Sequence, residues 1–325
     1  MLHQRMRIAL LLSAAAILAT HAGLQQPPDD AADDNAPYVV VLGIAQDGGY
    51  PQAGCHEPCC EAVRSGDAAR RHVACLALVD PVSNQRWMFD ATPDFREQLR
   101  MLDAIAPPRP GAAAPGLDGI FLTHAHIGHY TGLMFLGHES IGASEVQTYV
   151  MPRMRTFLSG NGPWSQLVDY NNIKLRPIMD GRPIRLNDRL FITPIRVPHR
   201  EEFSEVVGYR IQGPNASALF IPDIDKWDRW TERLESILLT VDVAYLDGTF
   251  YADGELPGRD MSGIPHPFID ETIARLRQQN EELRRRVRFI HLNHTNPALR
   301  ADSEQRKAIE AAGMRVAEEM ERFGL

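Results

Sequence analysis

The sequence predicts an α/β fold in which helices sandwich two β-sheets. From residue 38 onward, short apolar strands alternate with helices, Gly and Pro punctuate the pattern, and no internal linker divides the chain. Strands outnumber helices and the helices fall between them, so two sheets fit better than a barrel. A chain of 325 residues with 44% apolar side chains can also bury a large core.

The predicted strands are apolar runs that end at Gly, Pro or a polar residue. In chain order they cover residues 39–44, 76–80, 86–90, 120–123, 146–150, 190–197, 206–211, 218–221, 243–246 and 287–292. A helix is predicted to begin at Thr92-Pro93, because a capping residue is followed there by Pro at the first helical position. Helices are also predicted over residues 226–239, 267–285 and 302–312.

The first residues have the pattern of a secretory leader. Two arginines precede an apolar run over residues 8–19, and small residues follow where a signal peptidase would cut. We therefore predict a signal peptide over residues 1–22, a disordered acidic tether over 23–37 and one folded domain over 38–325. The protein is then periplasmic or secreted, with no stable membrane span after cleavage. An uncleaved membrane anchor is the less favoured alternative.

The overall charge of the protein argues against polyanions as partners. The formal net charge is −8 and the pI is near 5.8. A surface with this charge balance repels polyanions, so we expect a small-molecule substrate and no nucleic acid. The sequence leaves the oligomeric state open.

Three histidines follow the predicted strand at residues 120–123 with the spacing HxHxxH. His124 and His126 are two residues apart in an extended segment, so their side chains point the same way and can bind one ion together. His129 follows a glycine that lets the chain turn, and it can face a neighbouring ion. Imidazole is a common ligand of zinc and related metals, so the segment predicts a metal site. A histidine-rich surface turn is the alternative.

Four other predicted strands also end at residues that can bind a metal. These residues are Asp90, His199, Asp223 and His291. Ligands at the ends of successive strands gather at one edge of a sandwich, so we expect them to form a cleft with the three histidines. A turn carboxylate is the alternative for Asp223, and a core histidine is the alternative for His199.

The order of these residues resembles the metallo-β-lactamase fold hydrolases over residues 39–297. Within that superfamily, the chain is most similar to the group of coenzyme PQQ synthesis protein B. Matching phrases include Gly48-Gly49-Tyr50-Pro51-Gln52 and Leu246-Asp247-Gly248-Thr249-Phe250. The resemblance implies a four-layer αββα sandwich.

The resemblance also implies roles for the strand-end residues. A first metal would be held by His124, His126 and His199, and Asp223 would bridge. The second metal would be held by His129 and His291. Asp90 resembles a buried aspartate that orients metal-bound histidines.

One position departs from the family pattern. The family usually has Asp where this chain has Gly128, which gives HxHxDH. The loss of that anionic ligand predicts an asymmetric pair, in which the second metal is weak, replaced by another ion, or absent. Zinc is the expected metal, with one or two ions in the active site, and iron or manganese are alternatives.

His266 lies just before the predicted helix at residues 267–285. In phosphodiesterase members of the superfamily, a histidine at this place is not a ligand and assists proton transfer to the leaving group. An imidazole with a pKa of about 6.5 suits that role. A helix-start histidine without chemistry is the alternative.

Three cysteines follow the glycine-rich loop within a short span, namely Cys55, Cys59 and Cys60. An exported protein meets oxidising conditions, so a disulfide is one expectation. The resemblance offers another, because related proteins carry a CxCxxC cluster here that binds a structural zinc, completed by a histidine that corresponds to His294. Glu57 stands where the middle cysteine would fall, so Cys59 or His56 would have to substitute.

These patterns predict an exported metal-dependent hydrolase that cleaves an ester, phosphodiester, lactam or lactone bond with a metal-bound hydroxide. Asp223 would hold the hydroxide and His266 would protonate the leaving group. The alternative is an oxidoreductase or carrier that acts in biosynthesis of the quinone cofactor PQQ, as the family resemblance implies. Metal identity separates the two, because zinc has no redox chemistry and iron does.

Overall fold

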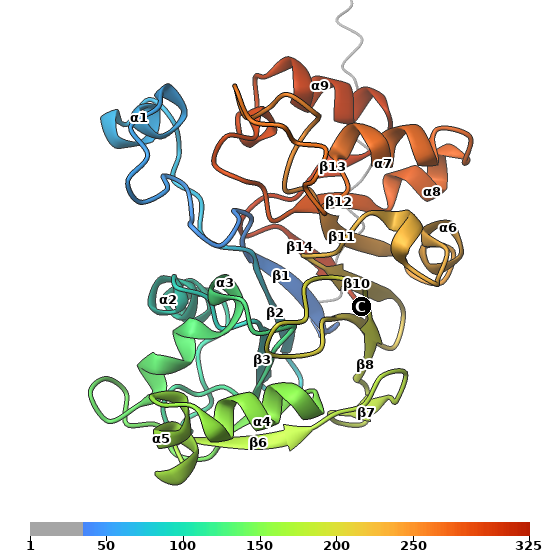
Figure 1. The fold of residues 1–325 in the computed structure, drawn as a ribbon. Coiled ribbons are helices and arrows are strands. Elements are labelled where there is room, and N and C mark those ends of the chain that lie inside the picture. Colours follow the sequence, from blue (N-terminus) through green and yellow to red (C-terminus); the bar gives the residue numbers. More distant parts are fainter. Residues whose placement is uncertain (1–34) are drawn as a thin grey trace, which may run out of the picture. The chain divides into compact units, whose positions relative to one another are not determined.

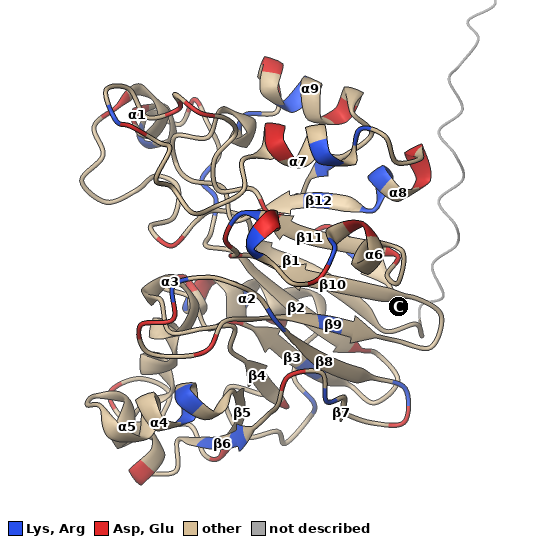
Figure 2. Ribbon diagram, turned by 45° about the vertical axis from the view of Figure 1, so that its right-hand side comes forward, with Lys and Arg blue, Asp and Glu red and all other residues tan. Residues whose placement is uncertain are grey.

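Two mixed sheets of seven strands lie at the centre of the protein (Figures 1 and 2). In spatial order, the first sheet contains β14 (Arg322–Gly324), β1 (Tyr38–Gly43), β2 (Cys75–Asp80), β3 (Gln85–Phe89), β4 (Gly119–Phe121), β5 (Val146–Val150) and β6 (Ile173–Pro177). The second contains β13 (Arg315–Val316), β12 (Val287–Ile290), β11 (Val243–Asp247), β10 (Ser217–Ile221), β9 (Val207–Gln212), β8 (Phe191–Arg196) and β7 (Ile184–Arg185). In each sheet, antiparallel pairing at one end gives way to parallel pairing at the other.

The computed structural model describes residues 35–325, which belong to one unit. The predicted signal peptide and most of the predicted tether fall in residues 1–34, outside this described part. The first described residue already contacts the rest of the domain, because the carbonyl oxygen of Asn35 accepts a hydrogen bond from Arg189 Nη2 at 2.8 Å. Within residues 35–325, every helix is too short or too polar to cross a membrane.

Helices flank both sheets. The α-helices are α1 (Pro58–Ser65), α2 (Phe95–Ile105), α3 (Ile127–Tyr130), α4 (Pro152–Gly160), α5 (Trp164–Asp169), α6 (Leu234–Leu238), α7 (Ile269–Leu276), α8 (Glu281–Arg285) and α9 (Glu304–Ala311). Short 3-10 helices are η1 (Thr131–Leu136), η2 (Trp227–Arg229) and η3 (Pro297–Leu299). Helices α2, α4 and α5 contact the first sheet, whereas α8 and α9 contact the second (Figures 1 and 2). This arrangement confirms the predicted α/β sandwich.

Aromatic side chains from both sheets meet in the core. The rings of Phe89 on β3 and Phe121 on β4 stack with centroids 5.2 Å apart, and both rings lie 5.5 Å from Tyr209 on β9. The Tyr209 hydroxyl donates a hydrogen bond to the carbonyl oxygen of Leu122 at 2.5 Å. This bond ties the segment that leads into the three histidines directly to the second sheet.

The four strands that sequence patterns missed are the edge strands of the two sheets: β14, β6, β13 and β7. They are short or partly exposed, and charged residues such as Lys174 on β6 and Arg322 on β14 interrupt their apolar pattern. Edge strands need fewer buried side chains because one side faces no partner strand, so their sequences carry a weak signal.

The helix predicted over residues 226–239 is wrong. The structure has η2, an extended residue at Trp230, and then the short helix α6. The Trp227 indole donates to Thr272 Oγ1 at 2.9 Å, while the Trp230 indole donates to the Arg196 carbonyl at 3.0 Å. The two tryptophans are thus fixed by different parts of the fold, and the extended backbone at Trp230 and Arg233 separates η2 from α6.

Two other helix boundaries also differ from prediction. The segment 267–285 forms two helices, because the side chain of Asn280 accepts a hydrogen bond from Leu283 N at 2.8 Å and caps a new helix, α8. Helix α2 begins at Phe95 rather than at Thr92-Pro93. The Thr92 hydroxyl instead donates to Gln98 Oε1 at 2.6 Å and accepts from Asp94 N at 3.1 Å. The remaining predicted helix, at residues 302–312, corresponds to α9.

Candidate metal centre

The strand-end residues of both sheets converge at one edge of the sandwich. The three histidines follow β4 and Asp90 follows β3 in the first sheet. In the second sheet His199 follows β8, Asp223 follows β10 and His291 follows β12. The structure therefore brings together every active-site residue that the sequence analysis selected, although they come from separate segments.

A first group of possible ligands contains His124, His126, His199 and Asp223. One ligand atom from each lies within 4.8 Å of all the others. Asp223 Oδ2 is 3.2 Å from His199 Nε2 and 3.4 Å from His124 Nε2. His126 faces the group with Nδ1, which is 2.9 Å from His124 Nε2.

A second group contains Asp47, His129 and His291. Asp47 Oδ1 lies 3.3 Å from His129 Nε2 and 3.2 Å from His291 Nε2. Asp223 Oδ2 is 4.0 Å from His129 Nε2, so Asp223 stands between the two groups. Gly128 contributes no carboxylate to this group, but Asp47 places one there. The predicted weakness of the second metal stays a prediction.

Hydrogen bonds set the tautomers of the histidines. His129 Nδ1 lies 2.7 Å from Asp90 Oδ2, and His199 Nδ1 lies 3.0 Å from Asp225 Oδ1. Carboxylates only accept, so each Nδ1 carries the hydrogen, and in the neutral ring each Nε2 keeps its lone pair for the interior of the site.

Two threonines act in the same way. Thr123 Oγ1 donates to Asp90 at 3.0 Å, so it can only accept from His124 Nδ1, which is also 3.0 Å away. Thr249 Oγ1 donates to Asp247 at 2.7 Å and lies 3.0 Å from His291 Nδ1. The Nε2 lone pairs of these two histidines are consequently also directed inward.

The buried polar atoms at the centre fit a divalent metal. His129 Nε2, His199 Nε2 and Asp223 Oδ1 are buried and make no hydrogen bond. Unpaired buried polar atoms are costly, and imidazole nitrogens with carboxylates are the donor set that binds zinc, iron or manganese. The inward lone pairs and the orphaned atoms together match metal coordination.

Two carboxylates of this site, Asp223 and Asp47, have lowered pKa values that favour a bound cation. Burial alone would raise the pKa of Asp223, but the neighbouring His266 and His199 hold it well below its ordinary value. Contacts with His129 and His291 likewise hold the pKa of Asp47 well below its ordinary value, against the effect of burial. Both carboxylates are ionised near neutral pH and favour a bound cation.

His266 lies beside these groups at the rim of a cavity. Its Nδ1 is 2.8 Å from Asp247 Oδ2 and 3.3 Å from Asp223 Oδ1. Burial would lower the pKa of His266, but the Asp247 and Asp223 carboxylates raise it to about 9. The cavity measures about 500 Å³ and is also lined by Arg200 and Arg259.

The backbone at two of these positions has a conformation that is uncommon for residues other than glycine. Asp90 has φ 69° and His291 has φ 66°. Both residues directly follow a strand, are fully buried and hold the second group together. Left-handed backbone at buried non-glycine residues concentrates at functional sites, where surrounding contacts impose it.

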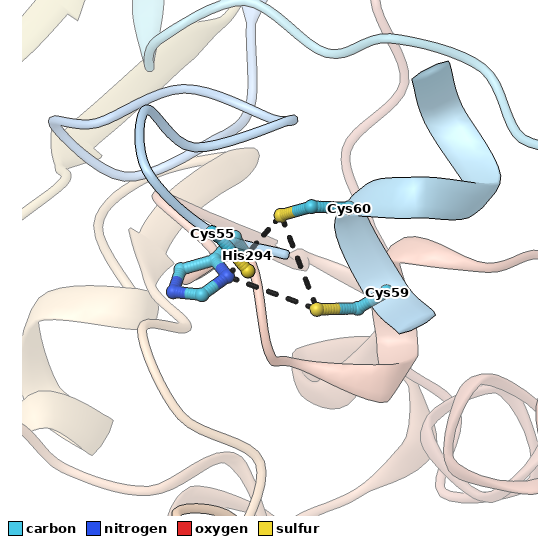
Figure 3. Close-up of side chains that lie close together, drawn as sticks. All are labelled: Cys55, Cys59, Cys60 and His294. Carbon is cyan, nitrogen blue, oxygen red and sulfur yellow. Dashed lines mark hydrogen bonds between the residues drawn. The ribbon is translucent and has the colours of Figure 1, made fainter. Parts of the chain in front are cut away.

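A separate cluster contains Cys55, Cys59, Cys60 and His294 (Figure 3). His294 Nδ1 is 3.4 Å from Cys60 Sγ and 3.8 Å from Cys59 Sγ, and the two sulfurs are 4.0 Å apart. Tetrahedral zinc, with bonds of about 2.3 Å to sulfur and 2.0 Å to nitrogen, separates its ligand atoms by about 3.5–3.8 Å. All four cysteines of the chain are free thiols here, and the fourth, Cys75, is buried in the core.

The cluster joins segments that are distant in sequence. Cys59 and Cys60 lie on α1, while His294 follows β12. His56, the other candidate for the missing middle cysteine, is exposed and lies 3.7 Å from Glu61. Burial raises the pKa of Cys59, and it raises that of Cys60 to about 12. Both thiols therefore hold their protons near neutral pH until a metal displaces them.

Three carboxylates at the centre were not selected from the sequence: Asp47, Asp225 and Asp247. Asp47 follows β1 and Asp247 ends β11, so the rule that strand ends carry ligands could have identified both. Asp225 follows Asp223 by two residues, a spacing that gave no separate signal.

A family model described as "Beta-lactamase superfamily domain" matches residues 85–292. Among curated proteins, coenzyme PQQ synthesis protein B of Xanthomonas campestris pv. campestris (strain B100) is 27% identical over 303 residues, which cover 86% of this chain and 97% of that protein. The protein of the same name from Methylobacterium sp. (strain 4-46) is 29% identical over 302 residues, which cover 86% and 96%.

Solved structures agree with this assignment. Zinc-bound PqqB from Methylobacterium extorquens superposes with a TM-score of 0.75 and 24% identity, covering 89% of this chain and 100% of that one. A diphosphatase from the PhnP family gives a TM-score of 0.60 with 20% identity, covering 89% and 97%. At these identities the structures show a shared fold, and the family model matches more than half of the chain. The protein belongs to the β-lactamase superfamily and has the metallo-β-lactamase fold.

Proposed function

We propose that this protein is an exported metal-dependent hydrolase that cleaves an ester, phosphodiester, lactam or lactone bond in a small anionic substrate. The observation that carries the proposal is the position of His266 beside both groups of ligands. Its Nδ1 contacts Asp247 and Asp223, so only Nε2 remains to meet a substrate in the cavity. A histidine held in this way can donate a proton to a leaving group.

Some residues of the site would hold the metal, and others orient the groups that react. When bound, a divalent metal supplies activation of water and polarisation of the scissile bond. The residues that would hold it are His124, His126, His199, Asp223, His129 and His291, the set that the sequence selected. Asp247 fixes the ring of His266 through the 2.8 Å contact, and Asp90 fixes His129. These contacts keep the reacting groups in one geometry, which is a large part of catalysis.

The cavity lining favours a negatively charged substrate. Arg200 and Arg259 lie on one side, and apolar Phe250 and Ile264 provide a surface for the body of the molecule. Within residues 35–325, the lining includes no carboxylate side chain. Arg200 also lies 3.2 Å from Glu202, so Arg259 is the better candidate for contact with a substrate anion.

The Cys/His cluster has a structural part in this proposal. A zinc ion held by Cys55, Cys59, Cys60 and His294 would fasten α1 to the segment after β12. That segment also carries His291, and His294 lines the cavity. A zinc ion here would therefore stabilise one wall of the cavity without taking part in the reaction.

A role in PQQ biosynthesis, as oxidoreductase or carrier, is the second candidate. It is favoured by similarity to coenzyme PQQ synthesis protein B over 97% of that protein's length. Bound iron with substrate-dependent electron transfer would support an oxidoreductase. Stoichiometric metal without turnover on any substrate would support a carrier.

The hydrolase proposal is tested with two phosphodiesters that differ in leaving group. p-Nitrophenolate leaves without a proton, whereas an alkoxide needs one. His266→Gln should keep its metal, lower kcat about 10²–10⁴-fold on the alkyl diester, and have a much smaller effect on the p-nitrophenyl diester. His138→Gln is the matched control, because His138 is an exposed histidine whose ring is tilted against that of Tyr170.

The outcomes separate the candidates. His126→Ala should lose metal and activity together. Equal rates for His266→Gln and wild type on both diesters would rule out His266 as the proton donor. Absence of hydrolysis by the metal-loaded wild type on diester, carboxylic ester, lactam and lactone would reject the hydrolase. The intact mass of the protein from its native host tests export, because cleavage near residue 22 would remove the leader.

A further inference from the structure

Positions 47 and 128 compete for the same space beside the second group of ligands. A Cβ atom placed on Gly128 would lie 2.3 Å from Asp47 Oδ1, 2.5 Å from its Cγ and 2.7 Å from its Cα. Atoms in close-packed interiors do not approach this closely, so no side chain at 128 is compatible with Asp47 in its place. Gly128 lies in α3 and does not have positive φ, so its backbone conformation does not require glycine. The space taken by Asp47 explains the glycine.

The Asp47 carboxylate points at the ligands of the second site. Its Oδ1 lies almost equally far from His129 Nε2, at 3.3 Å, and from His291 Nε2, at 3.2 Å. Of these two nitrogens, His129 Nε2 is buried and makes no hydrogen bond, so it lacks a partner of its own. In the neutral rings, the hydrogen bonds at Nδ1 direct both Nε2 lone pairs toward this carboxylate, and a cation bound between them would satisfy all three acceptors.

The backbone fixes Asp47 next to His291. Ala45 forms parallel bridges with both Val73 and Leu292, and Gln46 N donates to the Leu292 carbonyl at 2.8 Å. Gly49 N then donates to the Gln46 carbonyl at 2.7 Å and closes a turn. Asp47 is thus held between two anchored residues, and its position does not depend on an exposed loop.

We propose that Asp47 is the anionic ligand of the second metal ion, a divalent cation such as zinc. The loop after β1 thereby supplies the carboxylate that the family pattern places at position 128. Asp47, His129 and His291 offer three protein ligands to the second site. Asp223, whose Oδ2 lies 4.0 Å from His129 Nε2, would be the fourth and would complete the set that zinc requires. We therefore expect two ions in the active site. The inference rests on the metal-binding part of the proposed function and is independent of hydrolysis.

The first test removes the charge and keeps the shape. Asp47→Asn should weaken binding of the second zinc at least about tenfold, a loss as large as that from disturbing an orienting partner. The measurement is zinc per chain at fixed free zinc, with the unfolding temperature recorded with and without zinc. Asp67→Asn is the control, because Asp67 is an exposed carboxylate in the same connection between β1 and β2. Zinc at the cysteine cluster is common to all variants and cancels in the comparison.

The second test exchanges the two positions. Gly128→Asp alone should lower the unfolding temperature and should not increase zinc content, because its Cβ would overlap Asp47. The double variant Asp47→Gly, Gly128→Asp removes the obstructing carboxylate, and the remaining 2.7 Å approach to the Cα at position 47 requires a backbone shift of a few tenths of an ångström, which glycine permits. It should recover the second zinc and part of the lost stability relative to Gly128→Asp. A recovery of this kind cannot arise from general damage to the fold.

Two results would overturn the inference. One is unchanged zinc affinity in Asp47→Asn, and the other is a gain of zinc above wild type in Gly128→Asp alone. His129→Asn distinguishes this failure from failure of the metal site as a whole. If His129→Asn loses zinc while Asp47→Asn does not, only the role of Asp47 is rejected. If neither loses zinc, the active-site metal assignment itself is rejected.

Discussion

The metal centre and the Cys/His cluster both gather ligand-type side chains, but the contacts around them differ. At the metal centre, His129 and His199 each have a carboxylate at Nδ1, and His124 and His291 each have a threonine. Within residues 35–325, the His294 ring makes hydrogen-bond contacts with two thiols of the cluster, at 3.4 and 3.8 Å. The first site is therefore oriented by the protein, whereas the second is oriented by its own ligands.

The two sites also differ in the charge that their ligand side chains carry before a metal binds. Asp47 and Asp223 have pKa values well below ordinary and already carry negative charge. In the cluster, burial raises the pKa of Cys59 and Cys60, so both thiols are neutral without metal. We infer that the active site keeps its shape without metal, while the cluster depends on metal for its cohesion.

The largest expected effect comes from two histidines three residues apart. His294→Asn should lose the zinc of the cluster, make its three thiols reactive and lower the unfolding temperature. His291→Asn should lose the second active-site ion and keep the cluster zinc. Asparagine is chosen because it tolerates the left-handed backbone at position 291 better than alanine does. Zinc analysis with thiol titration measures both.

These two variants can contradict the assignment of His291 to the metal centre and of His294 to the Cys/His cluster. If His294→Asn releases the active-site metal and leaves the thiols protected, the assignments of the two histidines are exchanged. A disulfide in the cluster would be revealed by fewer reactive thiols in the denatured, chelator-treated wild type than in the same sample after reduction.

The pH dependence of zinc binding at the cluster gives the next largest effect. Because Cys59 and Cys60 have raised pKa values, zinc must displace a proton from each between pH 6 and 8. Their contribution should raise the apparent affinity about 100-fold per pH unit, so zinc is lost as pH falls. Asp47 and Asp223 stay ionised over this range and add nothing to the dependence. Competition with a chelator at several pH values measures it, and a flat profile would contradict neutral thiols.

The smallest expected effect tests whether orientation contributes to the active site. Asp225→Asn leaves a group of the same size beside His199 Nδ1 but removes the charge. We expect metal affinity to fall about 10–100-fold with little change in unfolding temperature. Asp228→Asn, an exposed carboxylate paired with Arg275, serves as the control. Equal metal affinity in both variants would show that the carboxylate behind His199 is dispensable.

Local patterns were sufficient for the central strands and for most ligand positions. Each central strand is a buried apolar run, and the polar residue that ends it lies at the sheet edge whatever its neighbours are. That is why Asp90, His199, Asp223 and His291 could be selected without a structure. The HxHxxH spacing is equally local. The fold class followed from the order of these elements.

Only the tertiary structure could decide features that join distant segments. Asp47 lies beside His129 and His291 because Ala45 bridges to Val73 and Leu292, a pairing that no local pattern encodes. The backbone is likewise extended at Trp230 and Arg233 and interrupts the helix predicted over 226–239, a break that the local pattern did not show.

The sequence by itself determined an α/β fold of two sheets between helices and a histidine-rich edge, because strand periodicity and ligand spacing act over a few residues. The four-layer αββα order was implied by the family resemblance. The tertiary structure decided which carboxylate completes the second site, since Gly128 shows only a missing side chain and the space it leaves is filled by Asp47. It also decided that Cys59, and not His56, faces His294. These outcomes depend on how segments far apart in the chain pack against each other and which side chains fit between them. The spacing of residues in the sequence carries no information about that packing.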